Sequence, residues 1–131
     1  ATNDAATMIA YCFAPKQGFS KFGSYTGNGN DDGTFIFCGF RPAFVMLKSS
    51  SDVEAWVLCD NKRLGYNADN NALLPDLTNA EATADDMDIL SNGFKLRRNT
   101  GYTNNSGSTY VYAAFAEAPF VNSNGVPCNA R

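Results

Sequence analysis

Histidine is absent from all 131 residues of the chain. Its absence excludes Ser-His-Asp and Cys-His nucleophiles, histidine metal ligands and imidazole acid-base catalysis. Charge is also sparse, because only 18% of the residues are charged, and 10 basic side chains against 13 acidic ones give a net charge of -3. Such a chain has no broad basic surface for phosphate groups. We therefore expect no nucleic-acid partner.

Long hydrophobic runs are missing as well. No segment approaches the roughly 18 apolar residues of a membrane-spanning helix, and residues 1–7 lack the basic flank and apolar stretch of a secretory signal peptide. We therefore expect no membrane partner. The 44% of hydrophobic residues is typical of a folded chain, and the length suits one domain with a sizeable core.

The four cysteines have no CxxC spacing and no histidine to complete a zinc site, so neither a metal cluster nor a cofactor is expected. Cys12, Cys38 and Cys59 lie in apolar runs, where a thiol behaves as a small hydrophobic group, and we predict that these three are reduced and buried. Cys128 lies in a polar stretch and is predicted to be exposed and reactive. A loosely held surface calcium ion among the acidic turns is left open.

What the sequence does contain is turn-forming residues. Fifteen asparagines and eleven glycines separate short apolar or alternating runs, which predict strands. The expected strands cover residues 7–14, 19–25, 34–38, 43–48, 54–59, 88–90, 94–97 and 109–117. A turn at Ser91-Asn92-Gly93 predicts a hairpin, because Asn-Gly is a strong hairpin signal. Thr78 and Glu81 have the spacing of a capping box and predict a single helical turn.

Short strands with hardly any helix are typical of an antiparallel sandwich or barrel. We predict an all-β fold, an antiparallel two-sheet β-sandwich of jelly-roll or concanavalin-like (lectin-like) type. Residues 1–120 are expected to form this single domain. Residues 121–131 show no pattern and are expected to form an extended C-terminal tail.

Trp56, the only tryptophan, lies in an apolar run. We interpret it as a core anchor, with a sugar-stacking platform as the alternative. The acidic residues are scattered through turns and form no recognisable acid-base pair, so we predict no catalytic residue and no enzymatic activity. A glycan depolymerase that works with paired aspartates is the less favoured alternative.

Two irregular segments, residues 60–71 and 99–108, are longer than tight hairpins require, and such segments in compact domains are often functional. Their aromatic, amide and guanidinium groups suit stacking on, and hydrogen bonding to, neutral or acidic sugars. The candidate ligand-binding residues are Arg63, Tyr66, Asn67, Asn70, Asn71, Tyr102, Asn104 and Asn105. The alternative is that the asparagines only satisfy the backbone of their own loops through Asx-turns.

Five segments carry a family resemblance. They are MIAYCF at 8–13, GFSKFGSYTGNG at 18–29, GFRPAFVMLK at 39–48, LSNGFKL at 90–96 and YVYAAFAE at 110–117. In order and spacing they resemble a domain of unknown function found at the C-terminal end of tail and structural proteins of marine tailed phages. Asp60 and Arg63 also fit that pattern, whereas cysteine at 38, 59 and 128 departs from it. The family has no catalytic motif to carry over.

The resemblance implies a virion location, with assembly in the host cytoplasm. It implies a tail-fibre module that recognises a glycan or protein on the host surface. A purely structural module that docks onto the tail or capsid, without receptor binding, is the alternative. The expected partners are the host receptor, other virion proteins and further copies of the chain, a trimer being the expected form, since fibres are usually multivalent.

Overall fold

The computed structural model describes residues 7, 9–63, 67, 71–83 and 85–117. Within these residues the chain forms nine strands and no helix, which confirms the all-β prediction. The strands are β1 Ser20–Thr26, β2 Phe35–Phe37, β3 Pro42–Ser49, β4 Val57–Asp60, β5 Asn71–Leu73, β6 Ala82–Thr83, β7 Met87–Leu90, β8 Gly93–Leu96 and β9 Thr109–Ala116. The described part therefore contains no helix that could cross a membrane. The tail expected at 121–131 lies outside the described residues.

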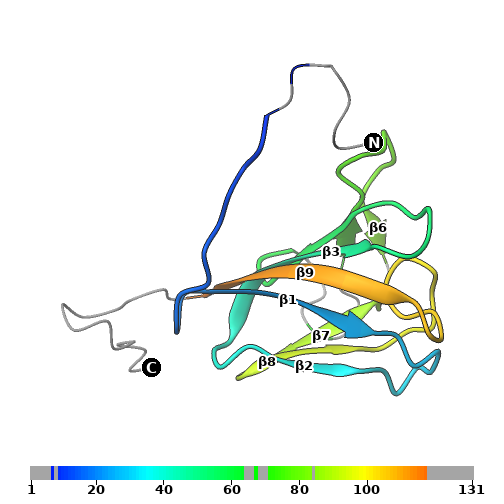
Figure 1. Cartoon of the computed structure of the whole chain (residues 1–131). Helices are drawn as coiled ribbons and strands as arrows, with labels where there is room; N and C mark the ends of the chain where they lie inside the picture. Colours follow the sequence, from blue (N-terminus) through cyan, green and yellow to red (C-terminus); the bar gives the residue numbers. More distant parts are fainter. Residues whose placement is uncertain (1–6, 8, 64–66, 68–70, 84, 118–131) are drawn as a thin grey trace.

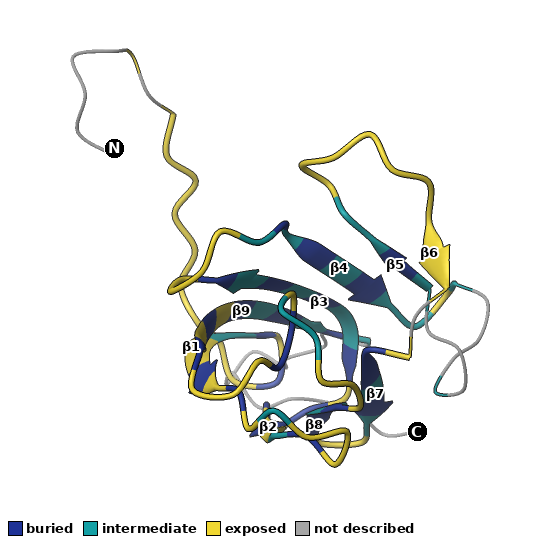
Figure 2. Cartoon of the chain, turned by 90° about the vertical axis from the view of Figure 1, so that its right-hand side faces the viewer, coloured by how far each residue is buried: buried dark blue, intermediate teal, exposed yellow. Residues whose placement is uncertain are grey.

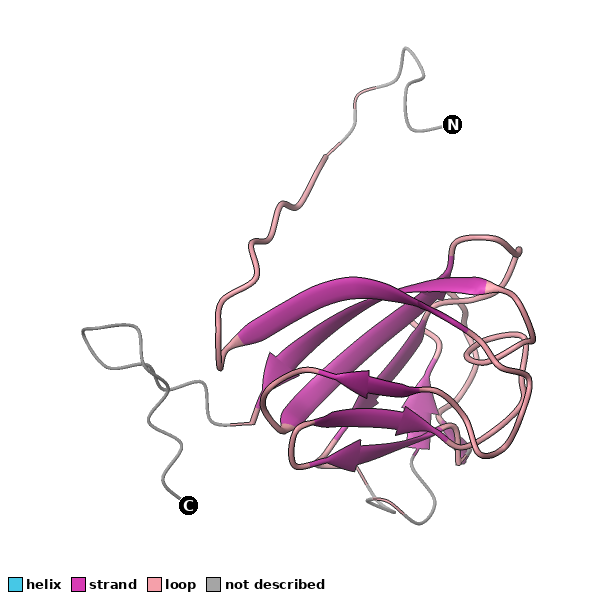
Figure 3. Ribbon diagram, turned by 60° about the horizontal axis from the view of Figure 1, so that its bottom comes forward, coloured by secondary structure: helices cyan, strands magenta, loops and turns pink. Residues whose placement is uncertain are grey.

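The strands form two antiparallel sheets. The larger sheet has six strands in the order β1-β9-β3-β4-β5-β6, and the smaller has three in the order β2-β8-β7. The smaller sheet lies below the larger one in Figure 1, and Figure 3 shows the same strands from below. The two-sheet sandwich expected from the sequence is therefore confirmed.

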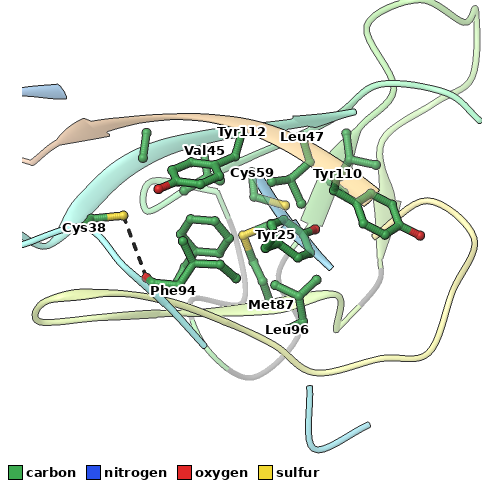
Figure 4. Close-up of a cluster of buried hydrophobic side chains, with 14 of the residues drawn as sticks. Tyr25, Cys38, Val45, Leu47, Cys59, Met87, Phe94, Leu96, Tyr110 and Tyr112 are labelled. Carbon is green, nitrogen blue, oxygen red and sulfur yellow. Dashed lines mark hydrogen bonds between the residues drawn. The ribbon is translucent and has the colours of Figure 1, made fainter. Parts of the chain in front are cut away.

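The core lies between the two sheets. In β9, Tyr110 and Tyr112 are buried and the intervening Val111 is exposed, because successive side chains of a strand point to opposite faces. Phe94 of the smaller sheet is fully buried and packs edge to face against Tyr112, with ring centroids 5.5 Å apart. Figure 4 shows these rings together with Met87 from β7. This aromatic packing joins the two sheets.

Two of the three predicted buried thiols lie in this core. Cys38 and Cys59 are free and buried, as predicted. Burial raises the pKa of Cys59 to about 12 and that of Cys38 to about 11, so both stay protonated at neutral pH. Cys12 is also free but exposed, so the prediction of its burial is wrong. Cys128 lies outside the described residues.

The predicted strand at 7–14 is wrong for the residues described there. Residues 7 and 9–14 belong to no strand and are exposed, and they extend away from the sheets in Figures 1 and 2. The main chain turns tightly just before β1, where the amide of Lys16 donates to Ser20 O at 3.0 Å and that of Ser20 donates to Lys16 O at 2.9 Å. We call residues 9–14 the arm. The arm has a strand-like sequence but pairs with none of the strands in the described part of the chain.

Two local predictions have different outcomes. The helical turn at 78–81 is wrong, because this segment is irregular and the Glu81 carboxylate accepts hydrogen bonds from Arg63 and Asn71 instead of capping a helix. The β7–β8 hairpin is confirmed. Its loop contains only Ser91 and Asn92, since Gly93 already pairs with Leu90. Glycine is required at 93 because a Cβ there would lie 2.0 Å from the carbonyl oxygen of Ile36 in β2.

Candidate functional site

The strand register decides at which end of the larger sheet each of the two predicted loops begins or ends. Strand β3 runs from Pro42 at one end of the larger sheet to Ser49 at the other. Strand β4 ends at Asp60 near the start of β3, so the β4–β5 loop begins at the Pro42 end. Strand β9 begins at Thr109 near the end of β3, so the β8–β9 loop lies at the Ser49 end. The described candidates of the two loops therefore lie at opposite ends of the sheet.

In the β4–β5 loop, the described candidates hold the loop in place. The Nε of Arg63 lies 2.8 Å from Asp60 Oδ2, and its Nη1 pairs with Glu81. Asn67 has a left-handed φ of 57°. Its side-chain amide exchanges two hydrogen bonds of 2.8 Å with the backbone of Ile89 in β7.

Two carboxylates surround the single guanidinium of Arg63, so this cation is already neutralised and is a poor partner for an acidic sugar. Asn71 also takes part in the corner, since its amide donates to the Glu81 carboxylate. The remaining candidates in this loop, Tyr66 and Asn70, lie outside the described residues.

In the β8–β9 loop, Asn104 has no exposed surface. Its Oδ1 accepts from the amide of Asn28 at 3.0 Å, and its Nδ2 donates to Asn28 Oδ1 at 2.9 Å and to Asn30 O at 2.8 Å. Asn104 therefore ties this loop to the β1–β2 loop and presents no atom to a ligand. Tyr102 is 39% exposed, and Asn105 is exposed with its amide donating to Ser108 Oγ at 3.1 Å. Of the predicted residues in this loop, Tyr102 and Asn105 are the exposed ones.

A different surface is open on the larger sheet. We call the side of this sheet that is turned away from the smaller sheet the outer face. It carries a groove of about 580 Å³. The residues that line the groove are Tyr11, Phe13, Phe22, Phe44, Met46, Trp56, Val111, Tyr112, Ala113 and Phe115. An antiparallel sheet that faces water on one side usually alternates apolar and polar residues, so apolar side chains on both faces are a departure from that pattern.

Phenylalanine rings form one end of the groove. Phe115 of β9 packs edge to face against Phe22 of β1 and Phe44 of β3, with ring centroids 5.7 Å and 5.8 Å apart. Phe13 of the arm stacks on Phe22 at 5.7 Å. These distances lie in the range of favourable aromatic pairs. The ring cluster therefore joins the base of the arm to the outer face.

Trp56 lies at the other side of the groove, so its assignment to the core is wrong. Its neighbours Ala55 and Val57 are buried in the core, whereas Trp56 is half-buried on the outer face. A second hollow of about 290 Å³ shares Trp56 and Met46 with the groove and continues to Pro75 and Asp76. The apolar surface thus extends from β1 across β9 and β3 to the residues before β6.

The sequence analysis missed the groove, although a signal for it is present. In residues 43–47 and 110–116 both alternating sets of side chains are mostly apolar. In an antiparallel sheet this pattern indicates that both faces are apolar. One set fills the core here, and the other set is left at the surface.

The arm adds further exposed apolar surface. Ile9 and Tyr11 are each 81% exposed, and Phe13 is 66% exposed. These three alternate with the small residues Ala10 and Cys12, so a strand formed by residues 9–13 would carry its three large side chains on one face. Figure 2 shows the arm as an exposed segment that leads away from the sandwich.

The groove offers few groups for chemistry. The polar side-chain groups that reach it are the hydroxyl of Tyr11 and the indole N–H of Trp56, since the ring of Tyr112 points into the core. In the part of the chain that is described, no group of three or more histidine, cysteine, aspartate and glutamate side chains is placed to hold a metal ion. The acidic turns are paired within the domain, as Asp32 is with Lys95 and Asp88 with Arg97. The arrangement suits the binding of apolar surface.

The comparisons with known proteins identify a family. The chain belongs to the family described as Domain of unknown function (DUF7483), whose pattern matches residues 1–119. No curated protein and no solved structure shows a significant similarity to the chain. The description of this family names no activity.

Proposed function

We propose that this member of the family is a non-catalytic assembly module, which docks onto another protein chain through the outer face of its larger sheet. The observation that carries the proposal is the apolar groove between the phenylalanine cluster and Trp56. Contiguous apolar surface on a folded domain is typical of sites of protein–protein contact. Aromatic residues and methionine are also enriched at such contacts.

The chemistry of the groove favours a polypeptide over a glycan as its ligand. A sugar presents many hydroxyls, and its recognition needs several directed hydrogen bonds besides a stacking ring. The groove supplies one tyrosine hydroxyl and one indole N–H among ten lining residues, since the Tyr112 ring points into the core. Apolar side chains of another protein would lose less favourable hydration in the groove than sugar hydroxyls would, and they would gain packing contacts.

The resemblance to tail and structural proteins of tailed phages supports a virion as the place of this docking. The partners would then be other virion proteins, met during assembly in the host cytoplasm. In this proposal the domain contributes interface area within the particle.

Receptor recognition is the second candidate function. The exposed Tyr102 and Asn105 at the Ser49 end favour it, because a tyrosine ring and an amide can stack on and hydrogen-bond to a host-surface glycan or protein. Several copies in one fibre would multiply a weak affinity. This candidate uses only part of the predicted loop site.

A phage that carries the domain can separate the two functions. Met46→Lys places a charge in the groove, and we expect incorporation of the protein into particles to fall at least about ten-fold, which corresponds to about 1.4 kcal/mol of lost contact. The matched control is Val53→Lys, because Val53 is fully exposed in the β3–β4 connection and does not line the groove.

Tyr102→Ala tests the second candidate in the same phage. If docking is the function, this variant is incorporated and adsorbs to host cells like the wild type. The circular dichroism spectrum of the purified Met46→Lys domain shows whether the variant still folds. If it folds and is incorporated into particles like the wild type, the docking proposal is overturned. Reduced adsorption of Tyr102→Ala with normal incorporation would establish receptor recognition.

A further inference from the structure

The chain carries two apolar surfaces that adjoin each other and are both partly open. One is the groove on the outer face, and the other is the row of Ile9, Tyr11 and Phe13 on the arm, of which Tyr11 and Phe13 also line the groove. The base of the arm contacts the outer face through Phe13, which packs on Phe22 and Phe115. Beyond Phe13 the arm leaves the sheet, and Ile9 and Tyr11 remain exposed.

The backbone of the arm also needs a partner. Residues 9–13 form part of no strand, although their alternation of large and small side chains is that of a strand. If the arm folded down onto its own groove, its N–H and C=O groups would lie against aromatic and aliphatic side chains. Backbone groups that lose water without gaining a hydrogen bond are strongly disfavoured. Closure of the arm onto its own chain is therefore a poor solution.

We propose that the groove receives the arm of a second copy of this chain, and that the two arms pair as antiparallel strands about a two-fold axis. Pairing of the arms satisfies the backbone groups on the edge that they share, and the row of Ile9, Tyr11 and Phe13 packs into the groove of the other copy. Each copy contributes one arm and one groove, so the contact occurs twice, as in other two-fold dimers. The inference rests on the proposed function, because it names the partner of the same face.

The size of the contact is sufficient for a specific dimer. Two arms bring four aromatic side chains, which bury roughly 150–250 Å² each, and two isoleucines. With the groove surface that they cover, the sum approaches about 1,200 Å², the lower end of the range that stable protein–protein interfaces bury. This dimer differs from the trimer expected from the phage resemblance.

The single tryptophan provides a direct probe. Trp56 is the only tryptophan of the chain and lines the groove, so its fluorescence reports whether the groove is filled. For the full chain we expect a dimer mass in sedimentation at tens of micromolar, with a blue shift of the tryptophan emission that follows dimer formation. The double variant Tyr11→Ser/Phe13→Ser should weaken dimerisation at least ten-fold and abolish the shift. Its fold should persist, because the arm lies outside the sheets.

Two further variants sharpen the test. Met46→Lys damages the groove and keeps the arm, and it should also be monomeric on its own. Val53→Ser, which alters a fully exposed valine away from the groove, should dimerise like the wild type.

Hydrogen exchange of the arm amides separates the outcomes. Protected arm amides in a dimer that both variants abolish would support the inference. A wild-type monomer with unprotected arm amides would overturn it and leave the groove open for another protein, so the proposed function would stand. A monomer with protected arm amides would show closure within one chain and overturn both. A dimer that survives both variants, or a trimer, would overturn the proposed pairing.

Discussion

Replacement of Asn104 by alanine tests whether this predicted ligand residue holds the fold. The substitution removes three side-chain hydrogen bonds, which join the β8–β9 loop to Asn28 and Asn30 in the β1–β2 loop. A typical hydrogen bond contributes about 0.5–1.5 kcal/mol, so the expected loss is about 3 kcal/mol. Because Asn28 and Asn30 are exposed, water can rebind to their polar groups, and the loss should not exceed this range.

Urea denaturation followed by circular dichroism measures this loss. The midpoint of unfolding should fall while the slope of the transition stays unchanged, since the extent of the folded surface is the same. The matched control is Asn105→Ala, next in sequence, which removes only the side-chain bond to Ser108 and should cost less than about 1 kcal/mol. Equal stabilities for the two variants would refute the structural role assigned to Asn104.

Two further predictions concern a glycine and a buried carboxyl group. Gly93→Ala should lower the melting temperature by several degrees, because the new Cβ meets the rigid backbone of Ile36. The control Gly101→Ala should change it little, because its Cβ meets only the flexible end of the Glu54 side chain. Equal melting temperatures for the two variants would contradict this. Burial raises the pKa of Asp86, so its contribution to stability is full below its ordinary pKa and is lost as the pH rises through the raised value. Asp86→Asn should abolish that loss. The measurement is the melting temperature of the wild type and the variant from about pH 3 to about pH 7, the range in which carboxyl groups titrate.

The local features of the fold could be predicted from the sequence. Strands β1, β3 and β9 and the β7–β8 hairpin lie where the apolar runs and turn residues indicate. The burial of Cys38 and Cys59 follows from their apolar neighbours in the same way. These features depend on residues that are adjacent in the chain, which is why a sequence pattern can reveal them.

The candidate site was harder to predict because it depends on contacts between distant segments. Loop length and composition drew attention to Arg63 and Asn104, but the partners that occupy their side chains come from other loops. Trp56 was assigned to the core because its run is apolar. The pairing of β4 with β3 decided which side chains of this segment point into the core and which point to the outer face.

The sequence by itself determined that this is an all-β chain of short strands, since apolar alternation and turn residues act over a few neighbouring positions. Only the tertiary structure decided three further matters. It set the two long loops at opposite ends of the larger sheet, turned the second apolar set of β3 and β9 to the outer face, and left the arm without a strand to pair with. The physical reason is that strand order and sheet pairing are long-range choices, and an apolar strand face is buried only where another layer covers it.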